Sequence, residues 1–189
     1  MEWEAEPQFV MGFHKPTYPN RDAFVMDVIS NVLATGRSSR LWERLVKKEQ
    51  KVSDVSSGSG PGRRFDNLMI FAATPVAPAT CHDVIAEIRE ELDRLAREPV
   101  TPTELEKALN QVKASQVRGI GSNRFAFSLL INELMYNDWR MYLKRADIVA
   151  SITPQEIMDA ARKYLIDENC TVAEIVRKPA PAQEVKNEK

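Results

Sequence analysis

The chain contains 189 residues, of which 43% are hydrophobic, and its 26 basic and 27 acidic side chains leave a net charge of −1. A chain of this length can bury the core of one substantial domain, and its composition is that of an ordinary soluble globular protein. The balanced charge argues against nucleic-acid binding, and the sequence has no apolar run of about 18 residues that could span a membrane.

The N-terminal half of the sequence predicts a strand, two helices and a β-hairpin. A run rich in β-formers ends at two proline turns and indicates the strand, and a capping residue and a closing Thr-Gly pair delimit the first helix. Basic residues gather late in the second helix, and a loop rich in glycine and proline joins the two hairpin strands. The expected ranges are 8–14 for the strand, about 20–35 and 38–51 for the helices, and 52–58 and 67–76 for the hairpin.

The C-terminal half predicts a run of helices and one last strand. Two Thr-Pro pairs, each with a Glu two positions after the proline, are typical of capped helix starts. The expected helices cover 79–97, a stretch after Thr101, 123–136, 139–150 and a stretch after Thr153, and the last strand covers 170–178. We therefore predict a single α+β domain over residues 1–178, built as a two-layer sandwich with helices on one face of a mostly antiparallel sheet. The tail at 179–189 is expected to be disordered.

The sequence lacks the ligands of a zinc hydrolase site. Such a site needs at least two close ligands, usually histidines at helical spacing, with a carboxylate nearby. Only His14 and His82 are present, and neither lies in an HExxH or an inverted HxxEH motif. His82 follows Cys81 at a helix start, but a metal site there lacks further ligands, so a solvated side chain is the favoured interpretation. Cys81 and Cys170 form neither a CxxC pair nor a disulfide framework.

Other catalytic motifs are also missing from the sequence. The loop sequence GSGPG is followed by neither Lys-Ser nor Lys-Thr and joins two strands, so it is neither a P-loop nor a dinucleotide fingerprint. Arg63 and Arg64 in this loop are candidates for contacts with acidic groups of a peptide or partner. No GxSxG elbow is present, so a serine triad has no support.

A cluster of aromatic residues, leucine and methionine is larger than one amphipathic helix face requires. Core packing and a hydrophobic surface for another domain of the same protein are the two interpretations. The cluster comprises Phe125, Phe127, Leu129, Leu130, Met135, Tyr136, Trp139, Met141 and Tyr142.

Taken in order, these pieces resemble the C-terminal, non-zinc-binding domain of the pitrilysin/insulinase family of zinc metallopeptidases. The resemblance covers nearly the whole chain, from DAFVMDVISNVLATGRSSRLWERLVKKEQKVSDVSSG through an apolar strand and a helix to VTPTELEKALNQVKAS and SITPQEIMDAARKYL. It implies a metallopeptidase-like fold of the LuxS and processing-peptidase type. The most specific piece is GRSSRLWERLV, which contains the family-motif residues Gly36, Ser39, Arg40, Leu41 and Leu45.

The resemblance also implies a division of labour between domains. Family members place zinc and the catalytic glutamate on an N-terminal HxxEH domain, so this chain is expected to hold no cofactor and to be inactive alone. In some family domains the corner at 45–53 carries an Arg and, seven residues later, a Tyr that hold substrate or stabilise the oxyanion. The matching positions here are Val46 and Ser53, which supply neither a cation nor a phenol. Arg44 or Lys47 could substitute in part if the register differs.

Two functions of different classes remain open. The first is a non-catalytic domain of a zinc metallopeptidase that forms part of a peptide-enclosing chamber and contacts the zinc-bearing domain. The second is a structural or assembly subunit of the same fold, as in the core subunits of the respiratory cytochrome bc complex. The expected partners are a zinc-bearing HxxEH domain on the same or an adjacent polypeptide, unfolded peptide and a second copy of the chain. The compartment stays open between the bacterial cytoplasm and the periplasm.

Overall fold

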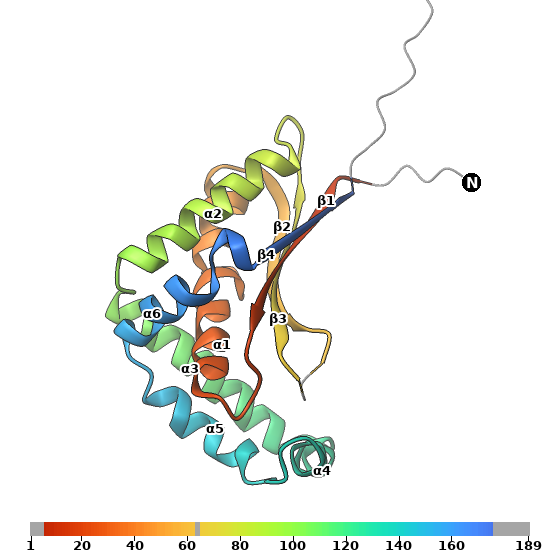
Figure 1. Ribbon diagram of the computed structural model, residues 1–189, viewed down its shortest axis with the longest axis vertical. Helices are drawn as coiled ribbons and strands as arrows, with labels where there is room; N and C mark the ends of the chain where they lie inside the picture. The colour runs from red at the N-terminus through yellow and green to blue at the C-terminus, as the bar shows by residue number, and fades with distance from the viewer. Residues whose placement is uncertain (1–5, 63–64, 176–189) are drawn as a thin grey trace, which may run out of the picture.

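The computed structural model describes residues 6–62 and 65–175. Along the chain, a strand is followed by two helices, a β-hairpin, a run of helices and a last strand, which is the predicted order (Figure 1). The elements are β1 (Gln8–Lys15), α1 (Arg21–Ala34), η1 (Trp42–Lys48), β2 (Val52–Gly60), β3 (Asn67–Pro75), α2 (Cys81–Arg97), α3 (Pro102–Ile120), α4 (Phe125–Tyr136), α5 (Met141–Ala150), α6 (Pro154–Tyr164), η2 (Asp167–Asn169) and β4 (Cys170–Ile175).

The four strands of the described residues form one antiparallel sheet with the order β2-β3-β1-β4. The hairpin strands pair with Ser57 opposite Phe71, and β1 then pairs with β3 on one side and β4 on the other. The first and last strands of the chain, β1 and β4, therefore lie side by side. The strands β2 and β4 form its two edges.

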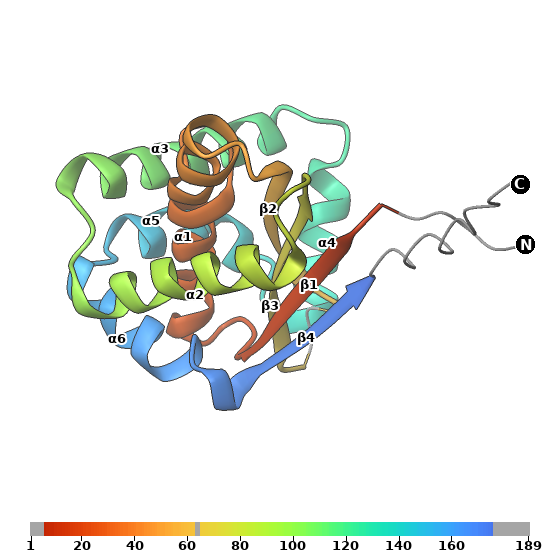
Figure 2. The ribbon, with the colours of Figure 1, turned by 90° about the horizontal axis from the view of Figure 1, so that it is seen from above.

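Helices cover one face of this sheet, which confirms the predicted α+β sandwich (Figures 1 and 2). Alternation along β1 turns Phe9, Met11 and Phe13 toward the helices, where each is at most 1% exposed, while Val10 on the other face is 42% exposed. The helix α1 lies at the centre of the helical layer and packs against α3, α5 and α6 as well as the sheet. The core therefore lies between the inner face of the sheet and α1.

The segment between α1 and β2 differs in kind from the single α-helix expected there. Most of it is η1, a π-helix of seven residues, in which the backbone N–H of Glu49 donates to the carbonyl of Arg44, five residues earlier. The wider turn keeps both Leu41 and Leu45 fully buried while the chain changes direction toward the sheet. A sequence pattern of apolar residues three or four apart does not distinguish such a π-helix from an α-helix.

Helix starts follow the capping residues closely. Thr80, Thr101 and Thr153 each form a capping box with the acidic residue three positions later. The helices after Thr101 and Thr153 begin at the predicted prolines, and the helix predicted from residue 79 begins instead at Cys81, directly after its cap. The last three residues of the predicted strand 170–178 and the tail lie outside the described residues.

Candidate functional site

The family-motif residues build the turn that leads from α1 into η1. Gly36 adopts φ +82°, a conformation that residues with a Cβ rarely take, and it ends α1 there. The Ser39 hydroxyl is buried and donates to the Gly36 carbonyl at 2.8 Å, and Leu41 and Leu45 enter the core without exposure. These motif residues therefore fix the backbone of the corner.

Arg40 ties this corner to the start of α3. Its guanidinium donates two parallel hydrogen bonds to Glu104, with Nε to Oε1 at 2.6 Å and Nη2 to Oε2 at 3.0 Å. The same carboxylate accepts from the backbone N–H of Thr101 and so also caps α3. The hydrogen bonds from Arg40 hold the pKa of Glu104 at about 2. Arg40 is thus a structural residue whose donors point into the fold.

Arg44 is likewise engaged within the chain. It donates to Glu49 at 2.9 Å, to Glu90 at 2.6 Å and to Glu91 at 3.4 Å, and so bridges η1 to α2. Burial opposes its charge, but the hydrogen bonds that Arg44 donates to Glu90 and Glu49 outweigh burial and raise the pKa of Arg44 above its ordinary value. A guanidinium held by three carboxylates has little free capacity for a substrate oxyanion.

The two positions that the resemblance assigns to substrate assistance carry neither a cation nor a phenol. Val46 is half-buried and packs against the core, while Ser53 is exposed and its hydroxyl donates to the Thr74 carbonyl at 3.3 Å. Lys47 is exposed and pairs with Glu43 on the same helix at 3.1 Å. The structure therefore places no phenol at position 53 and no unengaged cation at 44, 46 or 47. Arg63 and Arg64 lie outside the described residues.

Candidate metal ligands do not converge in the part of the chain that the structure describes. No group there of three or more His, Cys, Asp or Glu side chains could hold an ion. His14 and His82 are both exposed, whereas Cys81 beside His82 is buried. Cys81 and His82 therefore do not present their side chains to one common site.

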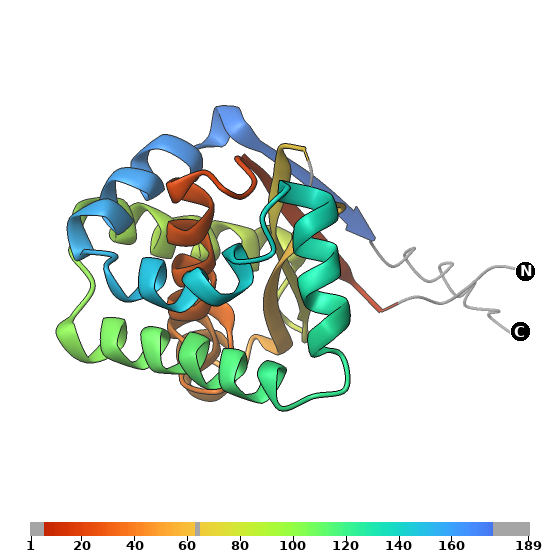
Figure 3. The same ribbon diagram turned by 90° about the horizontal axis from the view of Figure 1, so that it is seen from below.

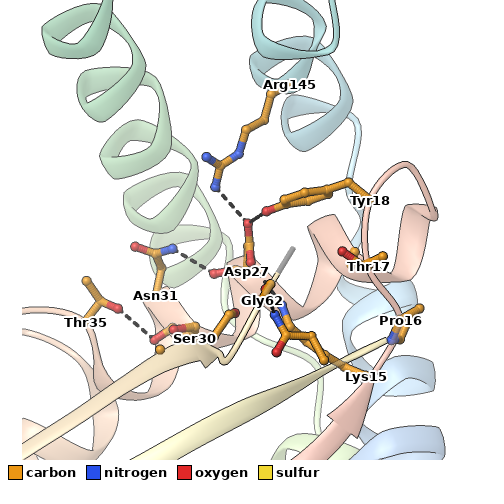
Figure 4. Close-up of a pocket in the computed structure, with 14 residues that line it drawn as sticks. Lys15, Pro16, Thr17, Tyr18, Asp27, Ser30, Asn31, Thr35, Gly62 and Arg145 are labelled. Atoms are coloured by element: carbon orange, nitrogen blue, oxygen red, sulfur yellow. Dashed lines mark hydrogen bonds and ion pairs between the residues drawn. The ribbon is translucent and has the colours of Figure 1, made fainter. Parts of the chain in front are cut away.

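A polar cavity that the sequence did not indicate lies between α1 and the β2 end of the sheet, with a volume of about 360 Å³ (Figure 4). At its centre the Asp27 carboxylate accepts a hydrogen bond from the Tyr18 hydroxyl and one from Arg145 Nη2 at 2.8 Å. Lys15 Nζ lies 3.4 Å from the other carboxylate oxygen. The cavity thus gathers two cations and one carboxylate from β1, α1 and α5.

The electrostatics of this cluster keep its donors protonated. Burial, followed by the negative charge of Asp27, raises the pKa of Tyr18 above its ordinary value. Burial disfavours the Arg145 cation, but the neighbouring Tyr18 and Asp27 outweigh burial and raise the pKa of Arg145. Both shifts favour the protonated forms, in which the Tyr18 hydroxyl and the Arg145 guanidinium donate hydrogen bonds.

Two of these residues had a signal in the sequence. Strand alternation that turns Phe9, Met11 and Phe13 inward also turns Lys15 inward, and Asp27 interrupts the otherwise apolar stretch between Phe24 and Ile29 of α1. The contributions of Tyr18 and Arg145 have no such signal, because their proximity arises only when α5 packs against α1.

Part of the aromatic and aliphatic cluster lies exposed on α4, whereas six of its members are half-buried, namely Phe125, Leu129, Met135, Tyr136, Met141 and Tyr142. None of the twelve residues of α4 is buried, and the helix contacts mainly α5. Phe127, Leu130 and Leu134 are 56%, 54% and 66% exposed, and their spacing of three and four residues places them on one side of the helix. Figure 1 shows α4 beyond the lower end of the sheet, next to α5 at the margin of the helical layer, and Figure 3 shows it from below. We name this row of three side chains the α4 stripe.

Comparison with known proteins identifies similar chains. Residues 3–112 match the family model described as the peptidase M16 inactive domain. The zinc protease PqqE of Helicobacter pylori is 23% identical over 171 residues, which cover 90% of this chain and 37% of that protein. An uncharacterised zinc protease of Streptomyces coelicolor is 26% identical over 147 residues, which cover 75% of this chain and 31% of that protein.

A solved structure shares the fold over almost its full length. The inactive peptidase domain of a candidate zinc protease from Bordetella parapertussis superposes with a TM-score of 0.82 at 21% identity, over 96% of this chain and 97% of that one. The chain spans about a third of the length of the two curated relatives. Within the described residues, no helix combines the length and the apolar character needed to cross a membrane.

Proposed function

The chain belongs to the peptidase M16 inactive-domain family, and on that premise we propose that it is the non-catalytic domain of a zinc metallopeptidase that docks against the zinc-bearing domain and helps to enclose peptide. Zinc and the catalytic glutamate lie on that other domain, in its HxxEH motif. The curated relatives are zinc proteases by name and about three times as long, which leaves room in them for further domains. This chain supplies binding surface and contact surface to such an assembly.

The observation that carries the proposal is the α4 stripe. A helix on the outside of a globular domain normally turns polar residues to solvent, whereas α4 exposes Phe127, Leu130 and Leu134 in one row. An exposed apolar row of this kind marks a contact site. Burial of a Leu or Phe side chain contributes roughly 1.5–3 kcal/mol, so the half to two-thirds still exposed here is worth about 1–2 kcal/mol for each residue.

The outer face of the sheet offers a second surface for a helix or chain from another domain. Gly58 of β2 lies on this face opposite Ile70 of β3 and has open space around it, whereas Leu68 of β3 covers Gly12 of β1. Val10 at this face remains 42% exposed. Small residues permit close approach of another backbone, so this face suits a wall of a chamber.

Extended peptide can be held at the β2 edge. The strand β2 pairs only with β3 in the described residues, so its other side presents unpaired backbone groups. A peptide that adds a strand there gains main-chain hydrogen bonds whatever its side chains are. Ser53 and Ser56 lie exposed along this strand and obstruct such pairing less than bulky residues would.

The proposal is tested by mixing the chain with the zinc-bearing HxxEH domain and measuring association by calorimetry and cleavage of an unfolded peptide. We compare the double variant Leu130→Ser/Leu134→Ser with the control Val76→Ser/Ile166→Ser, whose residues are 43% and 39% exposed away from α4. The α4 variant should bind about 30-fold more weakly or worse, from the loss of roughly 2–3 kcal/mol of apolar burial, and cleavage should fall with binding. The control should match the unmodified chain.

Equal affinity of both variants would contradict the docking role of α4. Tight association that is sensitive to α4, in a complex that binds peptide but does not cleave it, would instead favour the structural or assembly subunit.

A further inference from the structure

The polar cavity beside α1 carries an excess of positive charge. Among the described residues that line it, the charged groups are Lys15 of β1, Asp27 of α1 and Arg145 of α5, which sum to one net positive charge. The remaining walls come from polar or small residues of α1 and of the hairpin strands. An anion entering the cavity therefore meets a net attraction.

Among these charged groups, Lys15 has the weakest hydrogen bonding within the described residues. Its side chain is 5% exposed, and its one ion pair within the described residues is to Asp27 at 3.4 Å, a long contact for a charge-assisted hydrogen bond. An ammonium group has three donors, and a buried cation that lacks close partners is costly. Within the described residues, Lys15 Nζ thus has one hydrogen-bond partner for its three donors.

Arg145 also has donors to spare. One Nη2 hydrogen bond goes to Asp27, while its buried Nε has no hydrogen-bond partner in the part of the chain that the structure describes. Figure 4 shows Arg145 and Tyr18 approaching Asp27 from one side and Lys15 lying on the other. The Asp27 carboxylate therefore lies between the two cations, and a ligand that contacts both of them must lie beside Asp27.

We propose that this cavity binds a carboxylate group carried on a peptide, with Lys15 and Arg145 as its donors. A ligand carboxylate beside Asp27 accepts hydrogen bonds from Lys15 Nζ and from Arg145, and its charge offsets the net positive charge of the cavity. The volume of about 360 Å³ exceeds that of a bare ion and admits the residue that bears the carboxylate. The carboxylate chemistry rests on the cavity alone, whereas the peptide as its carrier rests on the proposed function.

The test uses the full chain without the zinc-bearing domain and measures binding by calorimetry. The probes are an acetylated tripeptide with a free C-terminal carboxylate, the same tripeptide with a C-terminal amide, an amidated tripeptide with a central Glu, and inorganic phosphate. A free carboxylate at the end or on the side chain should bind saturably, and the uncharged amide at least tenfold more weakly. The two carboxylate peptides distinguish a chain terminus from an acidic side chain as the source.

Variants separate a binding site from a merely structural cluster. Lys15→Met and Arg145→Gln should each weaken carboxylate binding at least tenfold, with Lys48→Met, an exposed lysine of η1, as the unaffected control. Asp27→Asn should tighten binding by a similar factor, because it removes the competing carboxylate while its amide oxygen still accepts from Tyr18. Circular dichroism verifies the fold of each variant, and Lys15→Met with Asp27→Asn suffice if Arg145→Gln does not fold.

The proposal is wrong if no carboxylate peptide binds, if phosphate binds and the peptides do not, or if Asp27→Asn leaves the affinity unchanged. None of these results bears on the docking of α4, because the zinc-bearing domain is absent from the experiment.

Discussion

Replacement of Glu104 by alanine tests whether the family motif acts by clamping the corner at 36–45 to α3. Three helices begin with the same capping box, which provides an internal comparison. Asp83 caps α2 and has no ion pair with a Lys or Arg among the described residues. Glu156 caps α6 and pairs with the exposed Arg21, while Glu104 caps α3 and pairs with Arg40, whose side chain is 10% exposed. The three substitutions to alanine therefore differ chiefly in the ion pair that is lost.

The magnitudes follow from exposure. Loss of the capping carboxylate and its interaction with the helix dipole costs about 1 kcal/mol, which is the whole effect expected for Asp83→Ala. Glu156→Ala also loses a pair whose partners are 32% and 45% exposed, worth below about 1 kcal/mol, for a total of about 1–2 kcal/mol. Arg40 is 10% exposed, and breaking a fully buried pair costs roughly 3–5 kcal/mol. Because Glu104 is 30% exposed, we take about 2 kcal/mol for the pair and about 3 kcal/mol in total.

Urea unfolding followed by far-ultraviolet circular dichroism measures these differences in the free energy of unfolding. A loss of about 3 kcal/mol also corresponds to a decrease in Tm of about 6–12 °C for a domain of this size. If Glu104→Ala destabilises the chain no more than Asp83→Ala, the clamp between Arg40 and Glu104 does not stabilise the fold, and the structural interpretation of the motif is refuted.

Four further outcomes are expected. The free energy of unfolding should decrease as the pH falls from about 5 toward 2, because the pKa of Glu104 is lowered to about 2 in the folded state. The stabilisation by the ionised carboxylate is present above the unfolded pKa and is lost when Glu104 is protonated. Glu104→Gln should reduce this pH dependence in a pH series of urea titrations. Gly36→Ala should cost about 1–2 kcal/mol in the same assay because of its φ of +82°, whereas Gly58→Ala, with open space around the added Cβ, should be near neutral. Leu45→Ala should lower the free energy of unfolding by about 3 kcal/mol, because Leu45 of η1 is fully buried in the core. A loss below about 1 kcal/mol would show that the Leu45 side chain is not tightly packed there. Elemental analysis of the purified chain should find no stoichiometric zinc, and one tightly held ion per chain would contradict the placement of zinc on another domain.

Local patterns were sufficient for most of the fold. Alternation in β1, the apolar spacing in α1 and α2 and the Thr-Pro capping boxes each act within a few residues, so the corresponding strands and helices are predictable without tertiary contacts. The same local information failed at η1, because the change from an α to a π hydrogen-bond pattern depends on how Leu41 and Leu45 fit the core. The absence of an HxxEH motif is likewise a property of the sequence alone.

The candidate surfaces required the tertiary structure. The sequence left the aromatic cluster open between core and contact surface, and only the position of α4 beyond the sheet shows that its stripe is exposed. The cavity joins Lys15 and Asp27 to Arg145, which lies 118 residues from Asp27 along the chain. The sequence by itself determined the order of elements and the family, because these depend on local propensity and on motifs. Which side chains meet, and which stay exposed, was decided by the packing of distant helices, because burial and electrostatic contact depend on distance in space.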